Sequence, residues 1–499
     1  MKSFLALLAL LATLTNALSA GAELKSGPMI GAAGMYETII WLQTSEAAEA
    51  QIRYWPSSAK KRADVVVTDL IQTSKDDAFV AKISVGPLIA GATYGYEVVI
   101  NGKKVTPTFS ETHAKAGKPI PLTFSAPKLW RYREGGHKPF DYTLGFGSCA
   151  YVNDPESQQD RLDGIPYGGD YQVFESIYEK APDAFIWLGD TLYLNEGDWT
   201  TSPGIYNRWT RSRALPELAP LLATTPHYFT WDDHEFGPND IGSSFWNKAA
   251  TTEAFELFTA NPSYGLPETP GIFSYFNHGD ANIYLLDNRT YRTEAMVVGA
   301  PYIEKQMLGK AQVDWLVNLM AWAEGQRHSS YPASFHIVCV GNQVISPARR
   351  DNLPRYEKEW QYLFDRLMNE DLNNVIFVTG DVHFGEVSKL ELTGGGDAVA
   401  GKPGIDGKAY TYYDITTSSL TAGSFPGFPA EENPQRYDIF EGEADRIGQR
   451  NFMLLRFTGE KLSQRQVAIE FYDTDGNLLN QKEGAPTGTV TDASILKPR

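Results

Sequence analysis

The sequence is poor in positive charge, in cysteine and in long hydrophobic runs. Lys and Arg together number 44 against 61 Asp and Glu residues, which gives a formal net charge of −17. This balance argues against a nucleic-acid-binding surface, because binding to a phosphate backbone requires clustered Lys and Arg. If so acidic a protein handles anionic substrates, it needs local positive charge, which bound cations can supply.

No apolar run is long enough for a membrane-spanning helix. The run from Phe4 to Leu14 has about half of the roughly 20 residues that such a helix requires. Lys2 precedes this run and small residues follow it from Ala17 to Ala22, an order that is typical of a secretory signal peptide. We therefore predict a signal peptide over residues 1–22, export to the periplasm or the cell exterior, and no stable transmembrane anchor. An uncleaved membrane anchor is the alternative.

Only two cysteines occur, Cys149 and Cys339. In an exported protein, the default interpretation of such a pair is a disulfide. However, each cysteine lies at the end of a predicted buried strand beside polar, glycine-containing sequence, where α/β proteins bind ligands. The spacing leaves both interpretations open.

The composition and patterning predict two folded domains. With 499 residues, 42% of them hydrophobic, the chain is long enough and apolar enough to bury at least one large core. Short alternating apolar runs such as Thr38–Leu42, Ala50–Tyr54 and Tyr94–Ile100 are separated by turn residues. This pattern predicts a small, fibronectin type III-like β-sandwich over residues 26–130.

From Asp141 onward, strand-like runs alternate with helical patterns. Ala184–Leu188 and Val375–Val378 are short continuous apolar runs, which are typical of buried strands. Glu357–Met368 instead carries apolar residues at spacings of three and four, which predicts a helix. Alternation of strands and helices indicates a layered α/β domain, which we place over residues 140–499.

Groups that can bind metals follow four of the predicted strands. Asp or His after a single strand is commonly a turn former or a helix cap, but four such coincidences predict a common site. Because α/β sheets bind ligands at the carboxyl ends of their strands, we expect these groups to meet at one edge of one sheet. Multivalent cations would relieve the repulsion among the carboxylates. The four segments are Gly147-Ser148-Cys149, Gly189-Asp190-Thr191-Leu192-Tyr193, Asp232-Asp233-His234-Glu235 and Gly380-Asp381-Val382-His383.

These motifs resemble the PhoD-like branch of the metallophosphoesterase superfamily, which is related to the purple acid phosphatases. Gly189–Tyr193 matches the Gly-Asp-x-x-Tyr signature, and Trp231–Glu235 matches the PhoD version of the Gly-Asn-His-Glu motif. Gly380–His383 is similar to the final Gly-His-x-His element, with Asp381 in place of the first His. The resemblance implies a metallophosphoesterase-type α/β/β/α sandwich preceded by a small all-β sandwich.

Two metal sites follow from the resemblance. Thiolate and phenolate donors suit Fe³⁺, whereas an all-oxygen site suits Ca²⁺ better than Zn²⁺; Mn²⁺ or Zn²⁺ at the second site are alternatives. A disulfide would remove one iron ligand, so we predict that Cys149 is free. The implied ligands are Cys149, Asp190, Tyr193 and His383 for ferric iron, and Asp190, Asp233 and Asp381 for calcium.

The implied reaction is hydrolysis of a phosphate ester by a metal-activated water. His234 is predicted to protonate the leaving alkoxide or to hold a phosphate oxygen, with a structural role as the alternative. Arg289 is predicted to bind phosphate, with an inward ion pair to an acidic neighbour as an equal alternative.

The resulting hypothesis is an exported phosphoesterase of the alkaline phosphatase D type, acting as a monomer on phosphomonoesters, phosphodiesters or both. A phospholipase D-like phosphodiesterase acting on phospholipid is the alternative among enzymes. The alternative that is not an enzyme is a surface binding protein with a degenerate metal site. The sequence speaks against the binding protein, because every predicted ligand position holds a donor.

Overall fold

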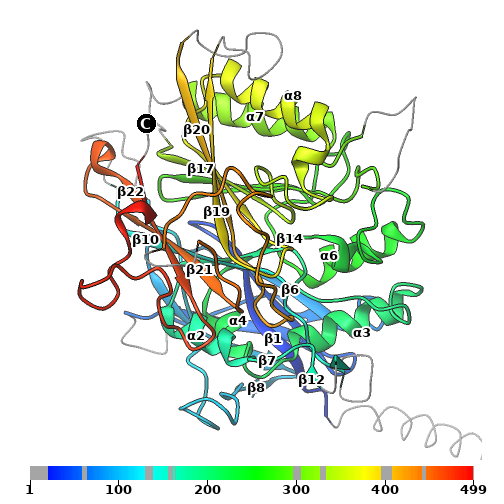
Figure 1. Cartoon of the computed structure of the whole chain (residues 1–499). Coiled ribbons are helices and arrows are strands. Elements are labelled where there is room, and N and C mark those ends of the chain that lie inside the picture. The colour runs from blue at the N-terminus through cyan, green and yellow to red at the C-terminus, as the bar shows by residue number, and fades with distance from the viewer. Residues whose placement is uncertain are drawn as a thin grey trace, which may run out of the picture.

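The computed structural model describes residues 21–58, 64–129, 139–154, 161–162, 165–295, 305–325, 333–394, 407–440 and 445–497 (Figure 1). The predicted signal peptide falls almost wholly on residues 1–20, which lie outside the described residues. In the described ranges, no helix combines the length and apolarity needed to cross a membrane.

The N-terminal region consists of antiparallel β-sheets that enclose a small apolar core. Ile40, Ile52, Ile83 and Val98 are buried together in this core. Tyr94 lies at the start of a strand, and its hydroxyl accepts a hydrogen bond from the Ile89 amide at 2.8 Å, as expected of a tyrosine corner. One sheet has the order β1 (Leu24–Ala33), β2 (Thr38–Thr44), β6 (Val80–Val85); the other has the order β4 (Val66–Val67), β3 (Glu49–Pro56), β7 (Thr93–Ile100), β8 (Lys103–Val105), with β5 (Ile71–Gln72) on β3 and β9 (Thr123–Ser125) on β7.

The larger region is built on two mixed six-stranded sheets within the described residues. Strands β10, β13 and β14 are parallel neighbours in the first sheet, and β16, β17, β18 and β20 are parallel neighbours in the second. The first sheet has the order β14 (His227–Thr230), β13 (Ala184–Leu188), β10 (Tyr142–Gly147), β21 (Phe452–Thr458), β22 (Gln466–Tyr472), β23 (Ile495–Leu496); the second has the order β15 (Ser274–His278), β16 (Ala281–Leu285), β17 (Phe335–Val340), β18 (Val375–Thr379), β20 (Ala409–Thr416), β19 (Glu386–Thr393).

The two sheets pack face to face, and helices cover their outer faces (Figure 1). Leu144, Ile186, Ile337 and Val378 lie in the core between the sheets. This arrangement is the α/β/β/α sandwich that the family resemblance implied. The helices on the first sheet are α2 (Gln172–Lys180), α3 (Ser202–Arg213), α4 (Ala219–Thr224) and α6 (Lys248–Phe258), and those on the second are α7 (Lys310–Gly325) and α8 (Glu357–Asn369).

The N-terminal sandwich packs against the first of these two layers. Trp41 on β2 lies in the same core as Phe258 at the end of α6, with ring centroids 5.9 Å apart, and its indole N–H donates to the Leu257 carbonyl at 3.0 Å. Tyr96 on β7 donates to the Ala223 carbonyl of α4 at 2.7 Å. The predicted boundary between the domains stays a prediction, because residues 130–138 lie outside the described ranges.

One expectation about the architecture is wrong. The metal-binding motifs do not lie at one edge of one sheet: those after β10, β13 and β14 belong to the first sheet, and that after β18 belongs to the second. Close approach between the sheets brings them together. A Cβ atom at Gly380, just after β18, would lie 2.7 Å from Ser148 Cβ and 2.8 Å from the Leu188 carbonyl oxygen, so only glycine fits there.

Candidate metal centre

Four of the six predicted ligands share an unusual backbone conformation. Cys149, Asp190, Asp381 and His383 have φ angles of 58°, 52°, 67° and 60°. Residues other than glycine rarely adopt this left-handed conformation, which costs about 1–3 kcal/mol each and is concentrated at functional sites. The tight turns that follow the strands therefore direct these side chains to one place at the expense of local strain.

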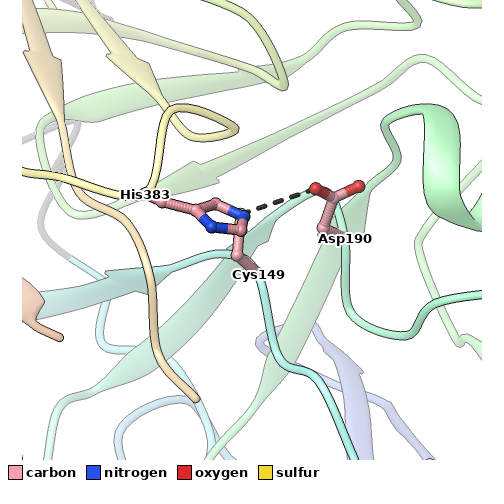
Figure 2. Close-up of side chains that lie close together, drawn as sticks. All are labelled: Cys149, Asp190 and His383. Carbon is pink, nitrogen blue, oxygen red and sulfur yellow. Dashed lines mark hydrogen bonds between the residues drawn. The ribbon is translucent and has the colours of Figure 1, made fainter. Parts of the chain in front are cut away.

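The first group of donors contains the four predicted iron ligands. Cys149 Sγ lies 3.5 Å from Asp190 Oδ2, the contact drawn as a dashed line in Figure 2. Tyr193 Oη lies 3.5 Å from the same carboxylate oxygen and 3.1 Å from His383 Nε2. Figure 2 shows His383 and Cys149 facing Asp190 from separate segments of the chain. The structure therefore brings all four residues together.

Asp190 is shared with two further groups of donors. It lies with Asp233 and His234 in one group and with Asp232 and Asp381 in the other, and the ligand atoms within each group are all within 4.8 Å of one another. Asp233 and Asp381, predicted as ligands of the second metal, are thus placed around Asp190. Asp232 was not predicted as a ligand, because its neighbour Asp233 alone aligned with the motif.

Burial and mutual repulsion govern the ionisation of these groups. Burial, and then the negative charges of Asp233 and Asp232, raise the pKa of Asp190 well above its ordinary value. Burial also raises the pKa of Asp381, although the Arg349 guanidinium opposes this shift. Burial lowers the pKa of His383 to about 4, which keeps its imidazole neutral near pH 7 and able to bind a metal.

The donor set fits multivalent cations. Within the described part of the chain, the buried Asp233 Oδ1 and Asp232 Oδ2 atoms accept no hydrogen bond. Buried carboxylate oxygens are ordinarily paired or bound to a metal. The thiol, phenol and imidazole around Asp190 suit iron, whereas the carboxylates on its other side suit an oxygen-binding cation such as Ca²⁺.

Glu235 stabilises the strained turn at Asp190 through hydrogen bonds. This carboxylate is fully buried and accepts hydrogen bonds from the Asp190 amide at 2.9 Å, the Asp232 amide at 3.1 Å and the Thr191 hydroxyl at 2.6 Å. It also accepts a bond from the Thr191 amide. The sequence motif contains Glu235, but only the structure shows that it supports Asp190.

Arg289 forms a buried ion pair with Asp232. Its side chain is fully buried, its Nε donates to Asp232 Oδ1 at 2.6 Å, and its Nη2 lies 3.7 Å from Asp233 Oδ1. The predicted catalytic role of Arg289 gains no support from this geometry. The structure instead shows the alternative, an inward ion pair, which compensates the buried charge of Asp232.

Asn342, which follows β17, connects this ion pair to Asp381. Its side-chain amide donates to Asp381 Oδ2 at 2.9 Å, and its carbonyl oxygen accepts from Arg289 Nη2 at 3.3 Å. Because Asn342 is fully buried, it positions Asp381 and has no access to substrate.

A cavity of about 340 Å³ opens over the donor groups. Asp190, His234, Asp381 and His383 line it, and so does Arg349. The Arg349 side chain is 29% exposed and lies 3.3 Å from Asp381 Oδ1. Sequence analysis missed Arg349, although its position in the loop after β17, at the same end of the sheet as Asp381, was an available signal. Two cavities of about 560 and 580 Å³ lie elsewhere and contain none of the donor groups.

His234 lies in the cavity wall beside the first donor group. Its ring lies against the Tyr193 ring with centroids 4.0 Å apart, and burial lowers its pKa. Its backbone amide lies 3.4 Å from Asp190 Oδ1. His234 therefore lines the cavity and also contacts the first donor group.

The two cysteines do not form a disulfide with each other. Both are buried and free, as predicted for Cys149. Cys149 Sγ accepts a hydrogen bond from the Ser418 hydroxyl at 3.1 Å, whereas Cys339 lies in the core between the two sheets.

Comparison with protein families agrees with the motifs. The family model described as PhoD-like phosphatase matches residues 144–458, and a model for a domain of unknown function matches residues 21–117. Alkaline phosphatase D of Bacillus subtilis (strain 168) is 26% identical over 280 residues, which cover 50% of this chain and 47% of that protein. The match thus spans about half the length of this curated relative.

Two solved structures share the fold. A structure of PhoD has a TM-score of 0.66 and 16% identity, with 95% of each chain covered. Purple acid phosphatase PPD1 from seeds of yellow lupin (Lupinus luteus) has a TM-score of 0.60 and 12% identity, with 90% of this chain and 72% of that chain covered. These likenesses confirm the predicted fold class.

Proposed function

Because the chain belongs to the PhoD-like phosphatase family, we propose that it is an exported, metal-dependent phosphoesterase that hydrolyses phosphomonoesters, phosphodiesters or both. The observation that supports this proposal most strongly is the convergence of three donor groups on Asp190 beneath an open cavity. In this proposal, Cys149, Asp190, Tyr193 and His383 hold ferric iron, and Asp190, Asp233 and Asp381 hold calcium. When bound, the cations lower the pKa of the attacking water and neutralise charge on the phosphoryl oxygens.

Two residues of the cavity then act on the ester. Arg349 presents a partly exposed guanidinium, which binds phosphoryl oxygens through a fork of N–H donors. His234, held against Tyr193, donates a proton from a ring nitrogen to the leaving alkoxide or holds a phosphoryl oxygen. Burial favours the neutral imidazole, so His234 must take up a proton before it can act as the acid.

The test compares hydrolysis of an aryl monoester and an aryl diester, followed as release of the aryl alcohol, with and without added iron and calcium. We expect turnover that depends on metal, and an Asp190→Asn variant that is slower by about 100-fold or more, because it loses the shared ligand. An Asp69→Asn variant, altered at an exposed position of the N-terminal region, serves as the charge control. Protein loaded with iron and calcium that releases no aryl alcohol from either ester would contradict the proposal. Choline release from phosphatidylcholine with negligible monoester turnover would favour the phospholipase D-like alternative.

A further inference from the structure

The cavity over the metal centre is lined by two kinds of residues. Arg349, His234 and Asn239 are polar and suit a phosphate group, whereas Phe425 and Phe428 belong to the same lining and are apolar. A cavity of about 340 Å³ is at the small end of the range for sites that bind small molecules. It therefore has room for more than the phosphate alone.

Phe425 and Phe428 form an aromatic cluster at the mouth of the cavity. Their ring centroids are 5.3 Å apart at an interplanar angle of 64°, and each lies 6.0 Å from the ring of Phe384, which is buried beneath them. Phe425 is 39% exposed and Phe428 is half-buried. Exposed aromatic surface beside polar catalytic groups is unfavourable in water and becomes favourable when an apolar ligand covers it.

Hydrogen bonds fix the segment that carries these two rings. The Phe425 amide donates to the His383 carbonyl at 2.7 Å, Arg446 donates to the Pro426 carbonyl at 2.7 Å, and Arg436 donates to the Phe428 carbonyl at 2.8 Å. Arg436 is itself held by an ion pair with the buried Glu386 at 2.8 Å. The backbone that carries the two rings is therefore held in place, which lowers the entropy cost of ordering it when a ligand binds.

We propose that Phe425 and Phe428 form a subsite for the alcohol part of the substrate, and that the protein prefers phosphate esters of aromatic alcohols to esters of polar alcohols. This inference rests on the proposed phosphoesterase function. The tilted ring pair offers both an edge and a face, with which an incoming ring makes favourable contacts. The backbone hydrogen bond from Phe425 to His383 places the subsite next to the proposed metal centre, and residues of both line the same cavity.

The first test measures binding, which does not depend on turnover. Isothermal titration calorimetry on metal-loaded protein compares phenylphosphonate with methylphosphonate, neither of which is hydrolysed. We expect phenylphosphonate to bind about tenfold more tightly, and Phe425→Ala to remove most of this difference without changing the affinity for methylphosphonate. Phe425→Leu should retain part of the preference. Trp322→Ala, which removes a 57% exposed ring from α7, should retain all of it.

The second test measures kcat/KM for phenyl phosphate and glycerol 1-phosphate in the wild-type and Phe425→Ala proteins. Comparing the ratio of the two esters between the two proteins cancels their different intrinsic reactivities. We expect the ratio to fall about tenfold in Phe425→Ala. If the wild type binds both phosphonates equally, the subsite is contradicted. The same holds if Phe425→Ala is active and its kcat/KM ratio for the two esters equals that of the wild type. Neither result would contradict the phosphoesterase function. Preferential binding of phenylphosphonate without turnover of either ester would support the subsite and overturn the function.

Discussion

The ligands of the proposed metal centre depend on residues that touch no substrate. Asp190 has a left-handed backbone, and the buried carboxylate of Glu235 accepts hydrogen bonds from its amide and from that of Thr191. Asn342 plays a comparable part for Asp381. These supporting contacts explain why positions with strained backbones persist at the site.

We predict that Glu235→Gln weakens metal binding. The substitution replaces an acceptor oxygen with an NH₂ group facing backbone N–H donors, which should destabilise the fold by about 1–3 kcal/mol and let the Asp190 turn relax. Metal content by elemental analysis and unfolding by denaturant measure the two effects.

Glu359→Gln is the matched control. Glu359 is also buried and accepts hydrogen bonds from the amides of Met307 and Gly309, but it lies outside the cavity lining. We expect a similar loss of stability with unchanged metal content. Equal metal loss in both variants would mean that Glu235 has no specific role at the centre.

A second prediction at the residue scale concerns Arg349. Because its guanidinium lines the cavity, Arg349→Gln should raise KM for a phosphomonoester about tenfold or more, and Arg349→Lys should recover only part of the loss. Steady-state kinetics measure the effect, with Arg53→Gln in β3 as a charge-matched control. An unchanged KM in Arg349→Gln would assign phosphate binding to other groups.

Among the elements, the ends of parallel strands determine where the ligands lie. Local patterns predicted many elements closely: Glu357–Met368 corresponds to α8 (Glu357–Asn369), and Ala184–Leu188 corresponds to β13 (Ala184–Leu188). The motifs after the strands also identified six donors that the structure brings together. The division of the strands between two sheets was not predictable from these patterns, because strand pairing depends on contacts distant in sequence.

The orientation of Arg289 was not predictable for a similar reason. Its motif allowed either a phosphate contact or an ion pair, and the buried Asp232 that decides between them lies on a different strand end. Arg349 carried no recognisable motif at all. Its position in the loop after β17 was an available signal, but only the folded loop shows that its guanidinium lies beside Asp381.

The close approach of the two sheets gives a prediction at the element scale. In Gly380→Ala, the added methyl group would overlap Ser148 and the Leu188 carbonyl, so the sheets must separate. We expect a loss of about 1–3 kcal/mol in stability and lower metal content. Gly325→Ala at the end of α7, where an added Cβ meets no atom within 4 Å, should leave both unchanged or slightly raise stability. A Gly380→Ala protein as stable as the wild type would contradict the packing described here.

For the molecule as a whole, bound cations should stabilise the folded state. The large apolar cores contain none of the donor groups, so the metal-free protein should stay folded, but with a lower Tm. Thermal unfolding with and without a chelator measures this difference, which should vanish in Asp190→Asn. A wild-type Tm that does not respond to the chelator would contradict the presence of a shared cation site.

The central claim, that side chains distant in the sequence jointly bind a cation, is tested most directly by the visible absorption of the iron-loaded protein. A phenolate bound to ferric iron gives a charge-transfer band, which we predict for the wild type and for Tyr151→Phe, whose ring lies 5.0 Å from that of Tyr193. The band should disappear in Tyr193→Phe. A band retained in Tyr193→Phe, or no band in wild-type protein that contains iron, would contradict the account.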